Sequence, residues 1–110
     1  DSQVNISNST ISGNSAQPGG LGGGIYSDKG SLQLMNSTVV SNHAGNGGGL
    51  FSDASDITIY NSVIANHQPD NDCASYPDGS FSETGPNWFS DDSCNGLASG
   101  DPLLGVLKDN

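Results

Sequence analysis

The sequence predicts an all-β protein, a right-handed parallel β-helix of about three coils followed by an irregular, disulfide-closed C-terminal segment. Three observations predict this fold: a recurring segment, alternation of apolar and polar residues within each copy, and asparagine or glycine at matching positions between copies. A single unit of about 25 residues cannot bury its own inward side chains, whereas several units stacked as coils can. The right hand is expected because crossovers between parallel strands are almost always right-handed.

The recurring segments begin at Val4, Leu32 and Ile57, so successive copies lie 28 and 25 residues apart (32 − 4 and 57 − 32). Each copy opens with apolar residues at alternate positions, and turn residues lie on both sides. A period of two with β-branched residues indicates short strands. In the first copy, strands are expected at residues 4–7, 10–12 and 24–27.

Stacking of the copies places equivalent side chains above one another, about 4.8 Å apart. Ile6 is then expected on Leu34, and Leu34 on Ile59. The aromatic residues Tyr26 and Phe51 follow matching Gly-Gly-Gly segments, so their rings are expected to stack in the same way.

Asparagine also recurs at two corners of the predicted coils. The two sets are Asn8, Asn36 and Asn61, and Asn14, Asn42 and Asn66. Stacked amides can hydrogen-bond along the axis and satisfy polar groups that turn inward. Asparagine also tolerates the left-handed backbone that a tight corner needs. We therefore expect two asparagine ladders that stabilise the stack.

The chain is expected to form one domain, with β-helix coils in residues 1–67 and an irregular capping segment in residues 68–110. The second part contains both cysteines, Cys73 and Cys94. A cysteine pair without Cys-x-x-Cys spacing, in a chain rich in Asn, Ser and Gly, favours a disulfide formed in an oxidising compartment over a zinc site. Two free, buried thiols are the alternative.

The charge of the chain excludes one class of partner. The 110 residues include 12 acidic side chains, two lysines and no arginine, and the net charge is −10. Almost nothing is available to neutralise phosphates, so nucleic-acid binding is excluded. No apolar run approaches the roughly 20 residues that a membrane helix needs, so no membrane span is expected.

Catalysis is not expected from the side chains present. A polyuronate lyase needs a basic residue beside its carboxylates, but Lys29 lies in a turn and Lys108 lies near the C-terminus. Hydrolysis needs carboxylates about 5–9.5 Å apart, which Asp70 with Asp72, or Asp91 with Asp92, could supply. Both pairs lie in irregular segments, where acidic side chains usually face water. The chain is therefore expected not to be an enzyme.

No cofactor is expected either, although two groups of side chains are metal candidates. His43 and His67 each follow a corner asparagine and could bind a metal together with a carboxylate. Asp28 and Asp53 are expected to lie one above the other, with Asp56 nearby, and a calcium ion would relieve their repulsion. The alternative is that these carboxylates are simply exposed to solvent.

The motifs resemble a known group of repeat proteins. The segments Asn8-Ser-Thr-Ile-Ser-Gly-Asn-Ser15 and Gly22-Gly-Gly-Ile-Tyr26 are similar to the right-handed parallel β-helix repeats of bacterial surface proteins. Asp72-Cys73, the motifs in residues 85–87 and 91–94, and Gly-Asp-Pro-Leu-Leu-Gly at 100–105 resemble the end of the choice-of-anchor Q family. Its members are secreted or surface-displayed proteins of bacteria and some archaea, usually with many more coils. The resemblance implies a secreted, extracellular or cell-surface protein, but no mode of anchorage is carried over from it.

The expected function is that of a non-enzymatic extracellular structural protein, a surface or matrix component that assembles with itself head to tail into filaments. A strand at Val4 and Ile6 would present unpaired backbone groups that invite pairing with another chain. Near the other end lie the apolar residues Leu103, Leu104, Val106 and Leu107. Head-to-tail contacts of this kind do not close, so they generate filaments.

Two other functions stay open. A glycan- or surface-binding adhesin module would need an exposed aromatic platform, and a carbohydrate-active β-helix enzyme fragment would need a carboxylate cluster in a groove.

Overall fold

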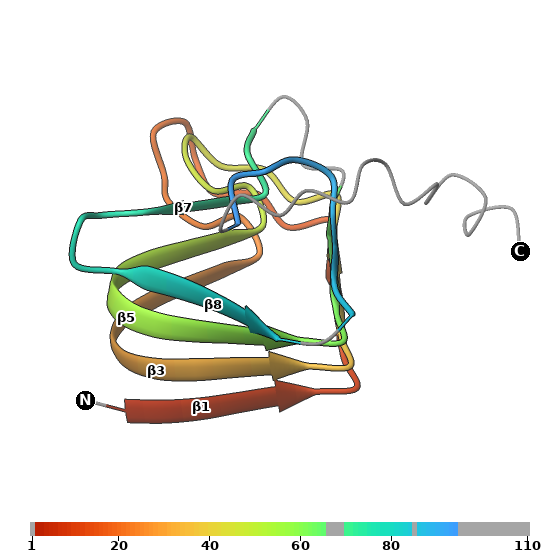
Figure 1. Ribbon diagram of the computed structural model, residues 1–110. Coiled ribbons are helices and arrows are strands. Elements are labelled where there is room, and N and C mark those ends of the chain that lie inside the picture. The colour runs from red at the N-terminus through yellow and green to blue at the C-terminus, as the bar shows by residue number, and fades with distance from the viewer. Residues whose placement is uncertain (1, 66–69, 85, 95–110) are drawn as a thin grey trace, which may run out of the picture.

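The protein is an all-β solenoid of stacked parallel coils (Figure 1). The structure, a computed structural model, describes residues 2–65, 70–84 and 86–94, and within them every regular element is a strand. The strands are β1 (Ser2–Ser7), β2 (Thr10–Ser12), β3 (Ile25–Met35), β4 (Thr38–Val40), β5 (Leu50–Tyr60), β6 (Val63–Ala65), β7 (Cys73–Ser75), β8 (Ser80–Thr84) and β9 (Trp88–Phe89). Several expected residues lie outside the described part of the chain, namely Asn66, His67, Leu103, Leu104, Val106 and Leu107.

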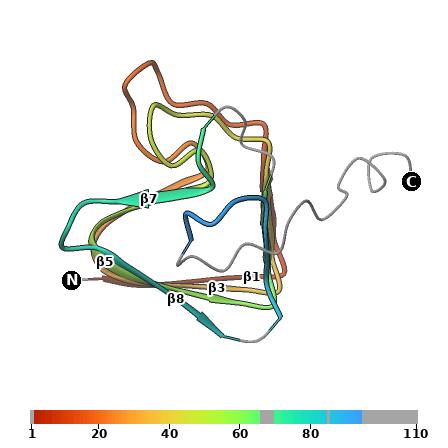
Figure 2. The same ribbon diagram turned by 45° about the horizontal axis from the view of Figure 1, so that its top comes forward.

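The strands form two parallel sheets that run side by side along the stack. One sheet has the order β1-β3-β5-β7, with β8 also paired to β5, and the other has the order β2-β4-β6-β9. Figure 2 shows that successive coils follow nearly the same outline. The expected fold class, an all-β solenoid of about three coils with a disulfide in the C-terminal segment, is confirmed.

The register agrees with the expected stacks. Ile6 pairs with Leu34, and Leu34 pairs with Ile59. Leu34 and Ile59 are completely buried and belong to one hydrophobic core, against which Ile6 packs. In the second sheet, Val39 and Ile64 supply the facing core side chains. The alternating apolar residues thus meet inside the coil, where apolar burial supplies the main driving force for folding.

The long strands differ from the expected short ones. Each of β3 and β5 has 11 residues and joins two strands that the sequence suggested separately. Both change direction where a residue has left-handed backbone, at Lys29 with φ of 56° and at Ala54 with φ of 54°. A single left-handed residue bends a strand without ending it, so a polar Asp-Lys-Gly segment resembles a turn in sequence although pairing continues across it.

The corner that contains Asn8, Asn36 and Asn61 is arranged differently from the expectation. These asparagines have φ between 48° and 52°, as the corner geometry requires, but their side chains are exposed rather than turned inward. Asn61 Nδ2 donates to Asn36 Oδ1 over 2.7 Å at the surface. The expectation that this ladder satisfies buried polar groups is therefore corrected.

The inward ladder at this corner is made by the residues that follow the asparagines. The Ser9 N–H donates to Ser37 Oγ over 3.1 Å, and the Ser37 N–H donates to Ser62 Oγ over 3.2 Å. The Ser62 N–H donates to Asn87 Oδ1 over 2.8 Å, and this last residue ends the series. We call Ser9, Ser37, Ser62 and Asn87 the serine ladder. Because the asparagine takes the left-handed turn, the next side chain points inward.

The second asparagine corner does contain a buried amide. Asn42 is fully buried, and its Oδ1 accepts from both the backbone N–H and the Nδ2 of Asn14, over 2.9 and 3.1 Å. Its Nδ2 donates to the carbonyl oxygen of Ile11 over 3.1 Å. The amide therefore connects two coils at the far end of the second sheet.

The segment expected to be irregular contributes strands to the stack. In its described part, β7 and β8 pair with β5 in two separate pieces, and β9 pairs with β6. Residues 76–79 loop out between β7 and β8, so the continuous β5 faces an interrupted partner. The expected disulfide between Cys73 and Cys94 is confirmed, and both cysteines are buried in the core.

Candidate functional site

An aromatic strip runs along the outer surface of the first sheet. It consists of Tyr26 on β3, Phe51 on β5, and Tyr76, which directly follows β7. The rings of Tyr26 and Phe51 stack as expected, with centroids 5.8 Å apart and planes inclined by 15°. Tyr76 meets Phe51 edge-on, with centroids 5.1 Å apart and an angle of 84°. Phe51 is buried between its neighbours, whereas Tyr26 and Tyr76 are 45% and 47% exposed.

Sequence reasoning missed Tyr76, because the loop that contains it breaks the repeat and nothing in its spacing relates it to Phe51. Its position depends instead on the backbone N–H of Tyr76, which donates to the carbonyl oxygen of Ser52 over 3.0 Å. This bond holds the residue directly above the aromatic pair.

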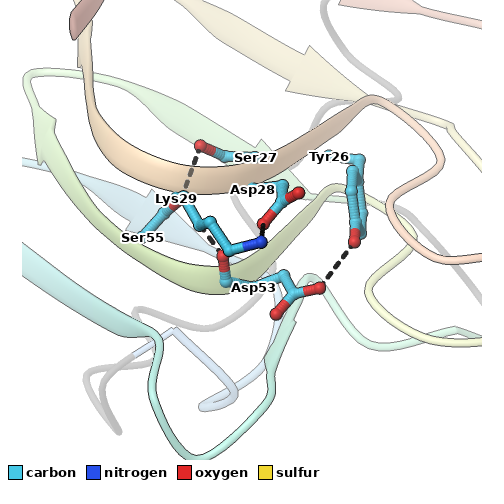
Figure 3. Close-up of polar contacts among 6 residues, drawn as sticks. All are labelled: Tyr26, Ser27, Asp28, Lys29, Asp53 and Ser55. Atoms are coloured by element: carbon cyan, nitrogen blue, oxygen red, sulfur yellow. Dashed lines mark hydrogen bonds and ion pairs between the residues drawn. The ribbon is translucent and has the colours of Figure 1, made fainter. Parts of the chain in front are cut away.

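The Tyr26 hydroxyl is fixed by a carboxylate on the next coil. It donates to Asp53 Oδ2 over 2.7 Å (Figure 3). This hydrogen bond, with partial desolvation and the negative charges of Asp53 and Asp28, raises the pKa of Tyr26 to about 12. Each of these effects favours the neutral phenol over the phenolate. The phenol is therefore held as a donor, and its ring orientation is set at both ends.

Asp28 and Asp53 pair in register on β3 and β5, as expected from the repeat. The Nζ of Lys29 lies 3.6 Å from Asp28 Oδ1, and both side chains are exposed (Figure 3). Lys29 and the Tyr26 hydroxyl thus each face one of the two stacked carboxylates. Asp28, Lys29 and Asp53 together form what we call the polar rim of the aromatic strip.

The third calcium candidate is directed elsewhere. Asp56 is exposed, and its Oδ1 accepts a hydrogen bond from Ser80 Oγ over 2.6 Å. In residues 2–65, 70–84 and 86–94 no three His, Cys, Asp or Glu side chains are grouped so as to hold a metal ion. The structure does not bring Asp28, Asp53 and Asp56 together into one site.

His43 has an acidic neighbour at the opposite corner of the coil. Its Nδ1 lies 3.4 Å from Asp70 Oδ2, which also accepts the backbone N–H of Ala44 over 2.9 Å. Asp70 therefore positions the backbone of the preceding coil. This role differs from the expectation that it lies in solvent as half of a carboxylate pair.

Asp72 and Asp91 form a reciprocal clasp that attaches the last described loop to the stack. Asp72 is fully buried, and its carboxylate accepts from the backbone N–H groups of Ser90 and Asp91 over 2.6 and 3.0 Å, and from Ser90 Oγ over 2.7 Å. In return Asp91 accepts from the backbone N–H groups of Asp72 and Ser93, over 3.0 and 2.8 Å. The expectation that these acids face water is corrected, because their lone pairs satisfy backbone donors.

The two ends of the stack differ in how their inward side chains are covered. At the first coil, Val4 is 45% exposed, whereas its register partner Leu32 on the next coil is only 4% exposed. At the other end Glu83 lies over Ile59, and its Oε1 accepts from Asn87 Nδ2 over 3.0 Å. The apolar stack is thus open at β1 and ends in a carboxylate at β8.

The comparisons with known proteins give one match. The model of the Chlamydia polymorphic membrane protein repeat matches residues 8–28, which include β2, the segment Gly22-Gly23-Gly24 and the start of β3. The chain is similar to this repeat over that segment. Comparison with curated proteins and with solved structures found no match.

No helix long and apolar enough to cross a membrane occurs in the described ranges 2–65, 70–84 and 86–94. The repeat match and the stacked coils agree on one point: this is a parallel β-helix repeat protein.

Proposed function

We propose that the protein is a non-enzymatic structural component of a bacterial surface or extracellular matrix, and that it associates end to end through its first coil. The similarity of residues 8–28 to a Chlamydia polymorphic membrane protein repeat supports a surface location. More narrowly, we propose that the chain belongs to the choice-of-anchor Q family. This proposal rests on the motifs at Asp72-Cys73 and in residues 85–87, 91–94 and 100–105, which resemble the end of that family. The proposal includes no cofactor and no metal.

The observation that carries the association is the open apolar edge at β1. Val4 and Ile6 occupy the positions that Leu32 and Leu34 occupy on the next coil, where both leucines are buried. An edge strand also presents a row of unpaired N–H and C=O groups that can pair with another strand. A further coil on β1 would satisfy these groups and cover the two apolar side chains.

The engagement of the carboxylates supports a non-enzymatic role. Asp72 and Asp91 accept backbone N–H groups, Asp53 accepts the Tyr26 hydroxyl, and Asp56 accepts Ser80 Oγ. A glycosidase needs one carboxyl group that is free to donate its proton and a second that is free to act as base or nucleophile. Of the four acids that the sequence offered for this chemistry, Asp70, Asp72 and Asp91 instead accept backbone N–H groups.

Sedimentation velocity over about a hundredfold range of protein concentration tests the association, since self-association depends on concentration. The wild-type chain is expected to sediment as larger species when concentrated. Ile6→Lys places a charge on the inward face of β1 and should keep the protein monomeric. Asn5→Lys adds the same charge on the exposed face of that strand and should leave association intact.

Two results would overturn the proposal: a wild-type chain that stays monomeric over the whole range, or an Ile6→Lys variant that associates like the wild type. Equal far-ultraviolet circular dichroism spectra of the two lysine variants show that the coils are retained.

Filaments are the proposed form of the assembly, with the apolar residues between 103 and 107 adding to the first coil of the next subunit. Electron microscopy of concentrated protein is expected to show filaments, and deletion of residues 102–110 should abolish them. Closed particles in place of filaments would mean that the first coils pair with each other instead.

A glycan- or surface-binding role is the second candidate. The exposed rings of Tyr26 and Tyr76 favour it, because an aromatic platform is what an adhesin of this kind requires.

A further inference from the structure

The aromatic strip has the properties of a pre-organised binding surface. Tyr26 is held on one side by the stacked ring of Phe51 and at its hydroxyl by Asp53, and Tyr76 is held edge-on to Phe51. Both tyrosines nevertheless leave almost half of their surface exposed. Rings that are already ordered lose little entropy when a ligand packs on them, which is why fixed tyrosines are effective contact residues.

The polar rim beside the strip both donates and accepts hydrogen bonds. Asp28 and Asp53 offer carboxylate oxygens, and Lys29 offers N–H groups on an exposed side chain (Figure 3). Sugar hydroxyl groups act as donors and acceptors, and the C–H face of a pyranose ring packs against aromatic rings. This combination of side chains therefore matches a carbohydrate.

The charge of the protein narrows the kind of carbohydrate. A net charge of −10 repels polyuronates and other acidic glycans at long range. A cationic ligand would compete with existing partners, because Asp28 already faces Lys29 and Asp53 already accepts the Tyr26 hydroxyl. A neutral glycan has no such conflict.

The spacing of the rings sets the size of the ligand. Tyr26 lies on β3 and Tyr76 follows β7, which are separated by the one strand β5. Two strand spacings amount to about 10 Å. Contact with both tyrosines therefore requires more than one sugar ring.

We propose that the aromatic strip, with Asp28, Lys29 and Asp53 as its polar rim, binds a neutral oligosaccharide. The site lies on the outer face of the coils, and Tyr26 is on the part of β3, Ile25 to Asp28, that pairs with β5 but not with β1. It deepens the second candidate function, glycan binding, by naming the site and the ligand class, and it rests on that candidate rather than on the structural role.

The test is a titration of the full chain, observed through the amide resonances of the protein, with four neutral tetrasaccharides: cellotetraose, maltotetraose, mannotetraose and chitotetraose. At least one is expected to bind and to shift resonances around Tyr26 and Tyr76. The double variant Tyr26→Ala/Tyr76→Ala should weaken that binding about tenfold or more, which corresponds to about 1.4 kcal/mol.

The matched control is Tyr60→Ala, because Tyr60 is equally exposed at 44% but lies outside the strip, at the end of β5. It should bind like the wild type, and Ile6→Lys, which is expected to stay monomeric, should bind at least as tightly as the wild type. Tyr26→Phe, which loses only the hydroxyl bonded to Asp53, should bind more weakly than wild type but better than the double variant.

The proposal is overturned if none of the four tetrasaccharides binds, or if the double variant binds as tightly as the wild type. It is also overturned if Tyr60→Ala weakens binding as strongly as the double variant. Preferential binding of an oligogalacturonate or an oligolysine over the neutral probes would show that charge, rather than the strip, selects the ligand.

Discussion

Adjacent residues at one corner of the coil have opposite roles. Asn61 has left-handed backbone and an exposed side chain, whereas Ser62 is almost fully buried in the serine ladder. Ser62 Oγ accepts the Ser37 N–H and donates to the carbonyl oxygen of Tyr60 over 2.9 Å. The hydroxyl thus satisfies the Ser37 N–H and adds a second donor to the Tyr60 carbonyl, which also accepts the Asn36 N–H over 3.0 Å.

Ser62→Ala removes the buried acceptor of the Ser37 N–H. Because the donor stays buried without a partner, the free energy of unfolding should fall by about 1–3 kcal/mol. Urea denaturation followed by circular dichroism measures this change.

Asn36→Gly is the control for the same corner, because glycine adopts the left-handed backbone without strain and only an exposed amide is lost. It should change the free energy of unfolding by much less than Ser62→Ala. A larger loss for Asn36→Gly would mean that the exposed amides, and not the serines, connect the coils.

The phenol of Tyr26 is predicted to titrate late. Its pKa of about 12 in the folded protein lies above the ordinary value of 10, so its contribution to stability is complete below pH 10. That contribution is lost as the pH rises from about 10 to 12. Tyrosinate absorbance should show one phenol that ionises near pH 12.

Asp53→Asn removes the charge that opposes the phenolate, so it should lower the pKa of Tyr26 towards 10. The ionisation near pH 12 should be absent from the titration of Tyr26→Phe. Its absence would assign that ionisation to the phenol of Tyr26. An unchanged late phenol in Asp53→Asn would show that Asp53 does not cause the shift.

Among the strands, the positions of β1 to β6 could be predicted from the sequence, although the continuity of β3 and β5 could not, and β7 to β9 could not be predicted at all. The first six repeat an apolar alternation that is visible in three copies, so their register follows from the alignment. In β8, Ser-Phe-Ser-Glu-Thr has one inward apolar residue, Phe81, and one inward carboxylate, Glu83. Two inward positions are too few to show the alternation of apolar and polar residues that marks a strand in the sequence. The strand forms because its backbone pairs with the edge of β5.

The roles of the acids were equally hidden in the sequence. The hydrogen bonds that join Asp72 to Ser90 and Asp91 link residues 18 or 19 positions apart, so no local spacing in the sequence reveals them. Asp72 and Asp91 therefore appeared to be solvent-facing loop residues. The positions of Tyr26 and Phe51 were predictable because both lie within the repeat, whereas that of Tyr76 was not.

Asp72→Asn tests the clasp between the last described loop and the stack. The amide keeps one oxygen but presents an N–H₂ group to the N–H donors of Ser90 and Asp91, so hydrogen bonds to a buried charge are lost. The expected loss is about 1.5–3 kcal/mol of unfolding free energy. Urea denaturation of the oxidised protein measures it.

Asp92→Asn is the matched control, because Asp92 is exposed and adjacent to the clasp. Its effect should be small, as surface substitutions usually are. Equal losses in the two variants would show that the net charge, and not the clasp, determines stability.

At the scale of the whole molecule, the described coils leave apolar side chains exposed at one end of the stack and cover them at the other. At β8 an inward-pointing carboxylate and a loop held by the Cys73–Cys94 disulfide cover the core, and inward charges are a known protection of sheet edges. At β1 the apolar side chains Val4 and Ile6 are at the edge. The axial association that we propose therefore involves β1.

Residue-resolved amide hydrogen exchange at low and high protein concentration tests this directly. If a further coil adds to β1, the amides of Ser2–Ser7 should become more protected as concentration rises, while those of Ser80–Thr84 on the last coil stay unchanged. Protection in β1 that does not depend on concentration, or that rises at β8 instead, would contradict association through the first coil.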